Sequence, residues 1–302
     1  MSIDEDPPRP IVVGLGEVLW DVFPDGPRFG GAPANYACSV AALSSQVEVF
    51  IASRVGDDDL GRQVTQEFKR RNVNTSVLQT DSKRTGVVNV LVDQDGVASY
   101  EFAADTAWDN LQWTLPMQSL AGRTTAVCFG SLGQRSAESR AAILQFVGAT
   151  PDDCLRIFDI NLRPPFHSDD VIVESLKLAN VLKLNDDELS VVARLSGESS
   201  AEESTDATLQ RITQCWNLDT VALTCGADGA MLLHGGVVYD GSVVSTKVVD
   251  TVGAGDAFTA AMTLGLLDGR PPAEICARAC RVAAFVCSQP GATPAIPDHL
   301  YS

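Results

Sequence analysis

Short apolar runs alternate with longer stretches of helical periodicity through the second half of the chain. Strands are predicted at 126–130, 156–160, 181–184 and 220–225, and helices at 136–147, 170–178, 186–195 and 205–216. A strand that follows such a helix returns parallel to the strand before it. The rhythm therefore predicts a doubly wound, mostly parallel α/β sheet with helices on both faces.

The N-terminal third has two kinds of apolar pattern. Residues 11–16 and 47–53 are short apolar runs typical of buried strands, followed by expected helices at 32–43 and 59–71. Residues 17–23, 85–92 and 97–102 instead alternate between apolar and polar, with a hairpin turn expected at 93–96. These segments predict a small sheet set apart from the main one, drawn from about 17–29 and 84–104.

The two ends of the chain complete the expected organisation. Residues 237–249 are rich in β-forming side chains, and helices are expected at 257–267 and 272–288. Residues 1–9 are acidic and proline-rich, so we expect a disordered leader there. Residues 10–302 are expected to form a single α/β domain, because no long linker or internal repeat interrupts them.

The charge balance is strongly acidic. Asp and Glu outnumber Lys and Arg by 39 to 22, which gives a formal net charge of −17. Nucleic acid is therefore not an expected partner, because neutralising phosphates needs a basic face, and anionic membrane surfaces are disfavoured for the same reason. ATP stays compatible, because a few local donors and Mg²⁺ outweigh a distant field of like sign.

The composition is that of an ordinary globular protein, with 45% hydrophobic and 20% charged residues. No apolar run reaches the roughly 18 residues of a membrane span, and the N-terminus lacks the basic and apolar regions of a signal peptide. The eight cysteines form no CxxC pair, and the three histidines have no zinc-like spacing. We expect a cytoplasmic protein with reduced thiols.

The segment from Asp250 to Phe258 carries the strongest chemical signal. Gly253 and Gly255 let the backbone approach a ligand, and the helix expected after them adds unpaired N–H groups that favour an anion. Asp256 has two interpretations. It is either the N-cap of that helix or, if the anion is a transferring phosphoryl group, the base that accepts a proton from an attacking hydroxyl.

These nine residues resemble the C-terminal signature of the ribokinase-like (pfkB) family of sugar and nucleoside kinases. The segment from Gly30 to Asn35 resembles the N-terminal signature of the same family, and further motifs lie between the two in the expected order. The resemblance implies that Asp256 is the catalytic base and that the turn before it is an anion hole made by Gly253, Ala254 and Gly255.

The resemblance also implies a sugar site in the N-terminal third. In the family, residues matching Gly30, Gly31 and Asn35 touch the sugar, and an Asp at the place of Asp21 accepts hydrogen bonds from its hydroxyls. From the residues alone, Asp21 could equally lie on the solvent face of its strand. The small sheet is implied to be a lid that excludes water, and it often also forms a dimer clasp in the family, so a homodimer is an expectation.

Polar residues after three further strands match other family motifs. Asn161 and Arg163 are placed to reach sugar or phosphate oxygens, or else to brace their loop. The implied ATP-binding residues are Asn185, Thr224, Gly226 and Gly229, together with Gly253 and Gly255. Asn185 and Glu188 are the implied Mg²⁺ residues, mostly through water, and Asn185 or Asp186 can also cap the helix that follows. Asp250 and Gly291 are candidates for a monovalent cation such as K⁺.

Two other nucleotide-binding designs are excluded by the sequence. Gly14 and Gly16 lack the third glycine of a dinucleotide fingerprint, since Leu19 stands there, and no Walker lysine motif occurs. The pattern around Asp21 and Gly30 most resembles fructokinases, so phosphorylation of fructose to fructose 6-phosphate is the first expectation. Kinases of ribose, 2-keto-3-deoxygluconate or nucleosides stay open, as does a non-catalytic relative that senses sugar or nucleotide.

Overall fold

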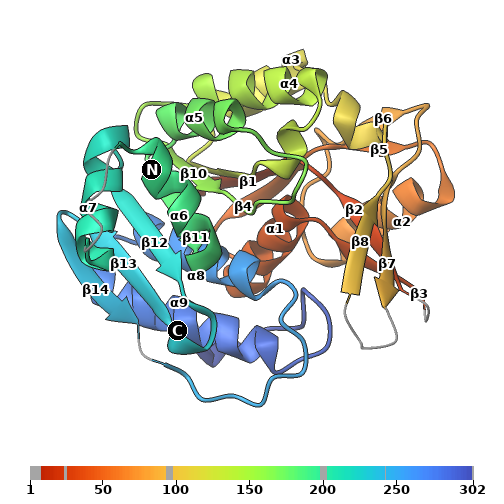
Figure 1. Ribbon diagram of the computed structural model, residues 1–302. Helices are drawn as coiled ribbons and strands as arrows, with labels where there is room; N and C mark the ends of the chain where they lie inside the picture. Colours follow the sequence, from red (N-terminus) through yellow and green to blue (C-terminus); the bar gives the residue numbers. More distant parts are fainter. Residues whose placement is uncertain (1–7, 24–25, 93–97, 198–202, 242, 301–302) are drawn as a thin grey trace, which may run out of the picture.

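An eight-stranded sheet runs through the middle of the computed structural model, which describes residues 8–23, 26–92, 98–197, 203–241 and 243–300 (Figure 1). The strand order is β14-β13-β12-β11-β10-β9-β1-β4. The strands are β1 (Ile11–Leu15), β4 (Glu48–Ala52), β9 (Ala126–Phe129), β10 (Leu155–Asp159), β11 (Val181–Asn185), β12 (Thr220–Thr224), β13 (Ala230–His234) and β14 (Val237–Gly241).

The strand order reverses at β1. The chain goes first from β1 to β4 on one side, then returns through β9 on the other side and continues outward to β12, with all of these pairs parallel. Only β13 and β14 are antiparallel at the far edge. In sheets of this kind, ligands bind beyond the carboxyl ends of the strands near the reversal. The predicted doubly wound sheet is confirmed.

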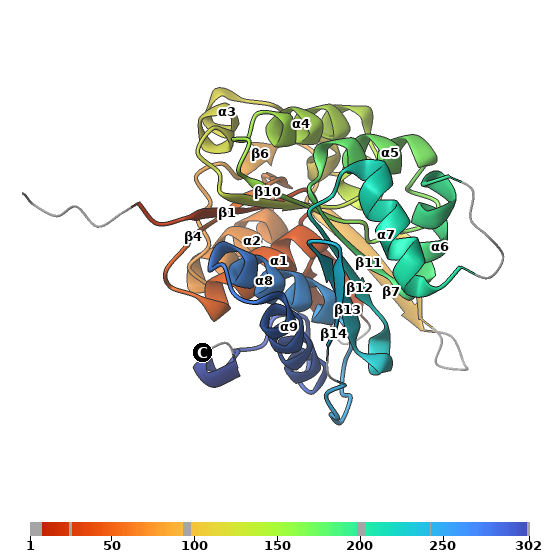
Figure 2. The same ribbon diagram turned by 90° about the vertical axis from the view of Figure 1, so that its left-hand side faces the viewer.

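Helices cover both faces of the sheet, as Figure 2 shows. Successive residues of the buried strand β1 alternate between two apolar clusters, with Val12 in one and Val13 in the other. The helices of the first face are α1 (Ala32–Leu43), α2 (Asp59–Arg70), α8 (Ala254–Leu267) and α9 (Pro272–Cys287). Those of the second face are α3 (Leu115–Ala121), α4 (Ala137–Gly148), α5 (Asp169–Leu178), α6 (Asp186–Leu195) and α7 (Thr205–Trp216).

The expected small sheet is also present, beside the main one (Figure 1). Its order is β3-β2-β7-β8, from β3 (Gly26–Gly30), β2 (Leu19–Phe23), β7 (Gly86–Val92) and β8 (Ala98–Phe102). The predicted turn at 93–96 lies outside the described residues. A further pair, β5 (Arg54–Gly56) and β6 (Gln79–Asp81), was not expected, because strands of three residues are too short to show an alternation.

The sequence-based prediction was wrong in two places near the C-terminus. The β-rich stretch expected at 237–249 ends as a strand at Gly241, because Gly241 pairs with Ala230 and β13 begins there, which leaves no partner for a longer strand. The helix expected at 257–267 begins three residues earlier, at Ala254. Most of the expected leader, residues 1–7, lies outside the described residues. Within the described residues, no helix has both the length and the apolar character needed to cross a membrane.

Candidate active site

The N-terminal turns of two helices from opposite ends of the chain meet beyond the carboxyl end of β1. Asn35, in the first turn of α1, donates a hydrogen bond from Nδ2 to Oδ2 of Asp256, in the first turn of α8, at 2.9 Å. This contact joins the N-terminal and C-terminal motifs of the sequence. The fold therefore brings the predicted sugar-binding Asn and the predicted base into direct contact.

Both glycines of the α8 turn lie close to neighbouring groups, and at Gly253 the backbone conformation also requires glycine. Gly253 is the N-cap with φ +79°, and a Cβ there would lie 2.3 Å from the carbonyl oxygen of Ala292. A Cβ on Gly255 would lie 3.0 Å from Nζ of Lys183. The turn can therefore lie close to its neighbours only without side chains. The N-cap of α8 makes no side-chain hydrogen bond, and the N–H of Ala254 donates to the carbonyl oxygen of Thr251 at 3.3 Å, so within this turn the N–H groups of Gly255 and Asp256 are the ones that can face an anion.

Asp256 is not the N-cap of α8. The helix begins at Ala254, so Asp256 is its third residue, and the capping interpretation is wrong. Burial, together with the negative charge of Asp159, raises the pKa of Asp256 to about 7, against the lowering effect of the hydrogen bond from Asn35 and the charge of Lys183. A carboxyl group with a pKa near neutrality is well suited to act as a general base.

A buried polar network lies beneath the α8 turn. Nζ of Lys183 donates to Oδ1 of Asp159 at 3.1 Å, and Thr259 donates to Oδ2 of the same carboxylate at 2.8 Å. Burial lowers the pKa of Lys183, but the carboxylates of Asp159, Glu188 and Asp256 outweigh this and raise it, so Lys183 stays charged. The network fixes α8 to β10 and β11. In the sequence, the sign of this network is a lysine within the apolar run of β11, a residue that the predicted site did not include.

A second buried carboxyl group, which sequence reasoning missed, lies at the end of β1. Glu17 is 2% exposed, and it accepts a hydrogen bond from the backbone N–H of Ala32 at the start of α1. Burial raises its pKa to about 7, and nearby Asp256 contributes to the rise. The sequence carried one usable signal, an acidic residue directly after a wholly buried strand.

Asp21 faces the same region from the small sheet. Its Oδ2 lies against Gly30 of the neighbouring strand, where an added Cβ would be only 2.6 Å away. Burial raises the pKa of Asp21 to about 6, opposed by the charges of Arg163 and Arg28. Arg163 also lowers the pKa of Glu17 and of Asp256. In the fold, the sugar-side carboxyl groups that the sequence predicts therefore lie near the charge of Arg163.

The raised pKa of Glu17 predicts a pH-dependent cost to stability. The folded protein keeps this proton up to about pH 7, whereas the unfolded chain loses it near 4.5, the ordinary pKa of a glutamate side chain. Glu17 therefore destabilises the fold progressively as the pH rises from 4.5 to about 7. We expect Glu17→Gln to shift the free energy of unfolding in favour of the variant by about 1–3 kcal/mol between pH 5 and pH 8.

Urea unfolding at the two pH values measures this shift. Glu138→Gln, at an exposed position of α4, is the matched control for loss of a carboxylate. A difference between Glu17→Gln and the unmodified protein that is the same at pH 5 and pH 8 would contradict the assignment.

The predicted nucleotide residues lie on neighbouring strands. Asn185 ends β11 and Thr224 ends β12, and the two are directly paired in the parallel register. After Thr224, a turn at Gly226–Asp228 leads into β13, with Gly226 and Gly229 at positive φ. A Cβ on Gly229 would lie 2.9 Å from the carbonyl oxygen of Gly241. These residues share the sheet edge with Lys183 and the α8 turn.

Asn185 and Glu188 form a capping box at the start of α6. Asn185 Oδ1 accepts from the N–H of Glu188 at 2.9 Å, and Glu188 Oε2 accepts from the N–H of Asn185 at 2.9 Å. The other oxygen of Glu188 accepts from the N–H of Leu162 at 2.7 Å. The cap predicted for Asn185 is thus present. A metal ion could contact this carboxylate only through its remaining lone pairs, which favours contact through water.

Asp250 and Gly291 are brought together just before the α8 turn. Asp250 accepts hydrogen bonds from the backbone N–H groups of Val252 at 3.0 Å and Gly291 at 3.1 Å. The contact ties the segment at 250–253 to the segment at 291–292. Among the described residues, no group of three or more His, Cys, Asp or Glu side chains is arranged to hold a metal ion.

Comparison with known proteins places this geometry in a family. The sequence pattern described as pfkB family carbohydrate kinase matches residues 25–299. The chain belongs to the pfkB family of carbohydrate kinases. The resemblance seen in its motifs is thereby confirmed, and the kinase has the fold expected from it.

Relatives of this pfkB kinase act on different substrates. It is 27% identical to the fructokinase of Escherichia coli over 94% of this chain and 95% of the relative. The structure of the Vibrio cholerae O395 fructokinase with fructose, ADP and calcium matches at 27% identity, TM-score 0.79, covering 97% of this chain and 98% of that one. The structure of the Salmonella enterica aminoimidazole riboside kinase with aminoimidazole riboside and an ATP analogue matches at 26% identity and a TM-score of 0.76. The match covers 96% of this chain and 98% of that one.

Proposed function

We propose that this pfkB carbohydrate kinase transfers the γ-phosphoryl group of ATP to a primary hydroxyl of a sugar, with fructose as substrate and fructose 6-phosphate as product. The observation that carries the proposal is the placement of Asp256. Its carboxyl group has a pKa near 7, contacts Asn35 of the sugar-side motif, and belongs to a glycine-rich helix N-terminus suited to an anion. A base beside an anion site is the arrangement that phosphoryl transfer to a hydroxyl needs.

In this proposal Asp256 takes the proton from the sugar hydroxyl, whose oxygen then attacks the γ-phosphoryl group. The N–H groups of the turn from Gly253 to Asp256 stabilise the negative charge that develops on the phosphoryl oxygens. Asn35 holds the carboxylate of Asp256 toward the sugar side. Asn185, Thr224, Gly226 and Gly229 bind the nucleotide from the adjacent strand ends.

Magnesium fits this site as an ion carried largely by the phosphates of ATP. Mg²⁺ characteristically keeps several waters and uses only one or two protein carboxylates in such sites. Both oxygens of Glu188 already accept backbone hydrogen bonds, so Glu188 and Asn185 would hold the ion through water. When bound, the ion neutralises charge on the transferring group. A monovalent cation such as K⁺ near Asp250 and Gly291 stays a prediction.

We further propose that the small sheet acts as the lid of the sugar site. It carries Asp21 in β2 and Gly30 in β3, and β3 leads directly into α1, whose first turn carries Asn35. A lid keeps water from the phosphoryl group and so prevents hydrolysis of ATP. A homodimer through this sheet and a cytoplasmic location stay predictions.

The charge of the sugar side favours a neutral substrate. Glu17, Asp21 and Asp256 face this region, with Arg163 as their shared cationic neighbour. An aldonate substrate, such as 2-keto-3-deoxygluconate, would bring another carboxylate into this group. Similarity to relatives does not choose the substrate, because a fructokinase, an aminoimidazole riboside kinase and a 2-dehydro-3-deoxygalactonokinase match at 27–29% identity. The fructokinase-like motifs around Asp21 and the carboxyl groups of this region favour fructose.

A substrate panel tests the proposal. ADP release would be measured with Mg·ATP and, separately, fructose, ribose, 2-keto-3-deoxygluconate, glucose, adenosine or aminoimidazole riboside. We expect fructose to give the highest kcat/KM. A stronger response to another compound would replace fructose and keep the kinase. If the protein bound ATP but released no ADP with any of these compounds, a sensing role would be favoured. The intact glycine turn at Asp256 argues against that role.

A further inference from the structure

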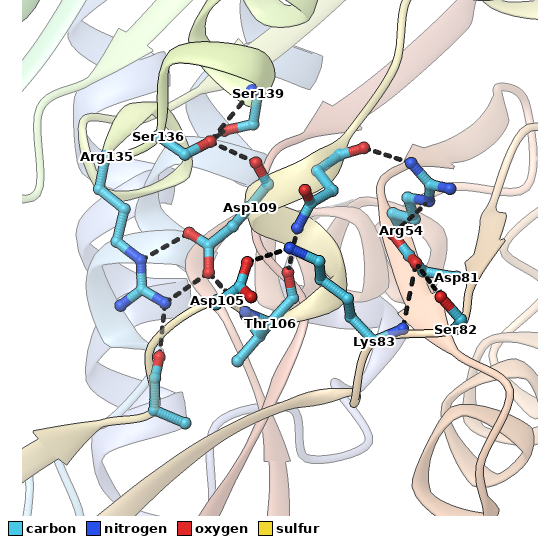
Figure 3. A network of polar contacts seen from close by, with 12 residues as sticks. Arg54, Asp81, Ser82, Lys83, Asp105, Thr106, Asp109, Arg135, Ser136 and Ser139 are labelled. Atoms are coloured by element: carbon cyan, nitrogen blue, oxygen red, sulfur yellow. Dashed lines mark hydrogen bonds and ion pairs between the residues drawn. The ribbon is translucent and has the colours of Figure 1, made fainter.

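A buried arginine lies where the small sheet meets the main body. Arg135 follows the short turn Leu132–Gln134 after β9, and its side chain is 8% exposed. Nε donates to Oδ1 of Asp109 at 2.7 Å and Nη2 to Oδ2 at 2.7 Å, which makes a bidentate ion pair (Figure 3). Asp109 in turn caps the 3-10 helix Ala107–Asn110 by accepting from the N–H and hydroxyl of Thr106.

Arg135 reaches the ends of β8 and β7, one directly and the other through a neighbouring side chain. Nη2 also donates to the carbonyl oxygen of Ala103, the residue after β8, at 2.6 Å. The guanidinium lies 4.0 Å from the ring centre of Trp108. The indole of Trp108 packs on Gly86, the first residue of β7, so closely that a Cβ there would lie 2.4 Å from Nε1.

The same guanidinium reaches the loop that carries Arg163. It lies 5.0 Å from the ring centre of Phe166, and the N–H of Phe166 donates to the carbonyl oxygen of Arg163 at 2.7 Å. Phe166 also packs edge-on against Phe102, the last residue of β8, with ring centres 5.2 Å apart. A short chain of contacts thus runs from the small sheet through Arg135 and Phe166 to Arg163.

An open hollow of about 800 Å³ borders Arg135 and Phe166, between α4, α5 and the segment after β8. None of the site residues predicted from the sequence lines it, so it is not the candidate sugar or nucleotide site. Within the described part of the chain, Nη1 of Arg135 is buried without a hydrogen-bond partner, which leaves one donor for a different arrangement.

We propose that Arg135 is a positioning residue that couples the seating of the small sheet to the placement of Arg163. Displacing β8 withdraws the carbonyl of Ala103 and the ring of Phe102, which together hold Arg135 and Phe166 in place. When the small sheet is seated, the same contacts are made, and they place Arg163 beside the carboxyl groups of the sugar site. This inference rests on the proposed function, because it assigns the small sheet and Arg163 to the sugar site.

Arg135→Lys is the informative variant. Lysine keeps the positive charge but lacks the planar guanidinium that pairs with Asp109 and stacks between Trp108 and Phe166. It should therefore not restore the contacts that Arg135 makes. We expect kcat/KM for the sugar to fall on the order of tenfold to a hundredfold, with KM for ATP unchanged. We also expect more ADP than sugar phosphate, because a poorly seated sheet admits water. Arg140→Lys is the matched control, since Arg140 pairs with Glu174 on α5 away from the small sheet.

Hydrogen exchange of the protein without substrates tests the coupling independently of any kinase activity. Phe166→Leu removes the ring contacts but leaves the Arg135–Asp109 pair intact, so it is less prone to unfold. We expect both Arg135→Lys and Phe166→Leu to raise exchange in 98–103 and in 161–168 together, with β1 and β9 unchanged. Faster exchange in only one of the two segments, or in neither, would overturn the coupling. If the coupling holds but no sugar is phosphorylated, only the proposed function fails.

Discussion

Asp256→Asn is expected to lower kcat by a factor on the order of 10²–10⁴ while the fold and the binding of both substrates are retained. Asparagine has nearly the same shape and keeps an oxygen to accept the hydrogen bond from Asn35. It cannot take up a proton from the sugar hydroxyl. The loss should therefore fall on kcat, with KM for the sugar changed little, because the base acts in the transition state.

Steady-state kinetics with saturating ATP and sugar measure this effect. Asp268→Asn is the matched control, because Asp268 is the C-cap of the same helix, far from its N-terminal turn. The control should keep full activity. Near-normal kcat in Asp256→Asn would remove this residue from the mechanism, and a loss shared by the control would point to damage to α8.

Lys183→Met is expected to lower the free energy of unfolding by about 3–5 kcal/mol, because it leaves the buried carboxylate of Asp159 without its ionic partner. The side chains of Lys183 and Asp159 are 9% and 6% exposed, so water cannot replace the lost interaction. The charge of Lys183 also lowers the pKa of Asp256. Any remaining activity should therefore need a higher pH than in the unmodified kinase.

Urea unfolding of single and double variants distinguishes this from simple loss of packing. In Lys183→Met/Asp159→Leu both charges are replaced by apolar groups, and most of the lost stability should return, since the uncompensated charge is gone. Equal instability in the single and double variants would contradict the explanation. It would show instead that the shape of the lysine, rather than its charge, supports the α8 turn.

Periodicity was enough to predict the architecture. The buried runs at β9 to β12 and the helices between them follow from repeats of two and 3.6 residues, and most predicted ends lie within one or two residues of those observed. Prediction failed where tertiary pairing decides the outcome. The β-forming side chains after Gly241 have no strand to pair with, and α8 begins at Ala254, directly after Gly253, whose positive φ and close approach to Ala292 no local pattern shows.

Sequence motifs predicted residues that line the candidate site, but not the buried residues that support it. Motifs predicted roles for Asp256, Asn35 and the strand-end residues, because their side chains or glycines lie in recognisable local patterns. Lys183, Asp159 and Thr259 come from three distant elements, so their network is visible only in the fold, and its one local sign is the lysine within the apolar run of β11. Arg135 is similar, since its significance depends on contacts with Ala103, Trp108 and Phe166 that only the fold supplies.

The most direct test of the central claim is a pair of ³¹P NMR time courses on the unmodified protein and Asp256→Asn. Both would contain the same ATP, Mg²⁺ and fructose. We expect a sugar phosphate resonance to grow together with ADP in the unmodified protein and to be nearly absent in Asp256→Asn over the same period. Equal growth of sugar phosphate in both samples, or ADP accompanied only by inorganic phosphate, would contradict phosphoryl transfer to the sugar by Asp256.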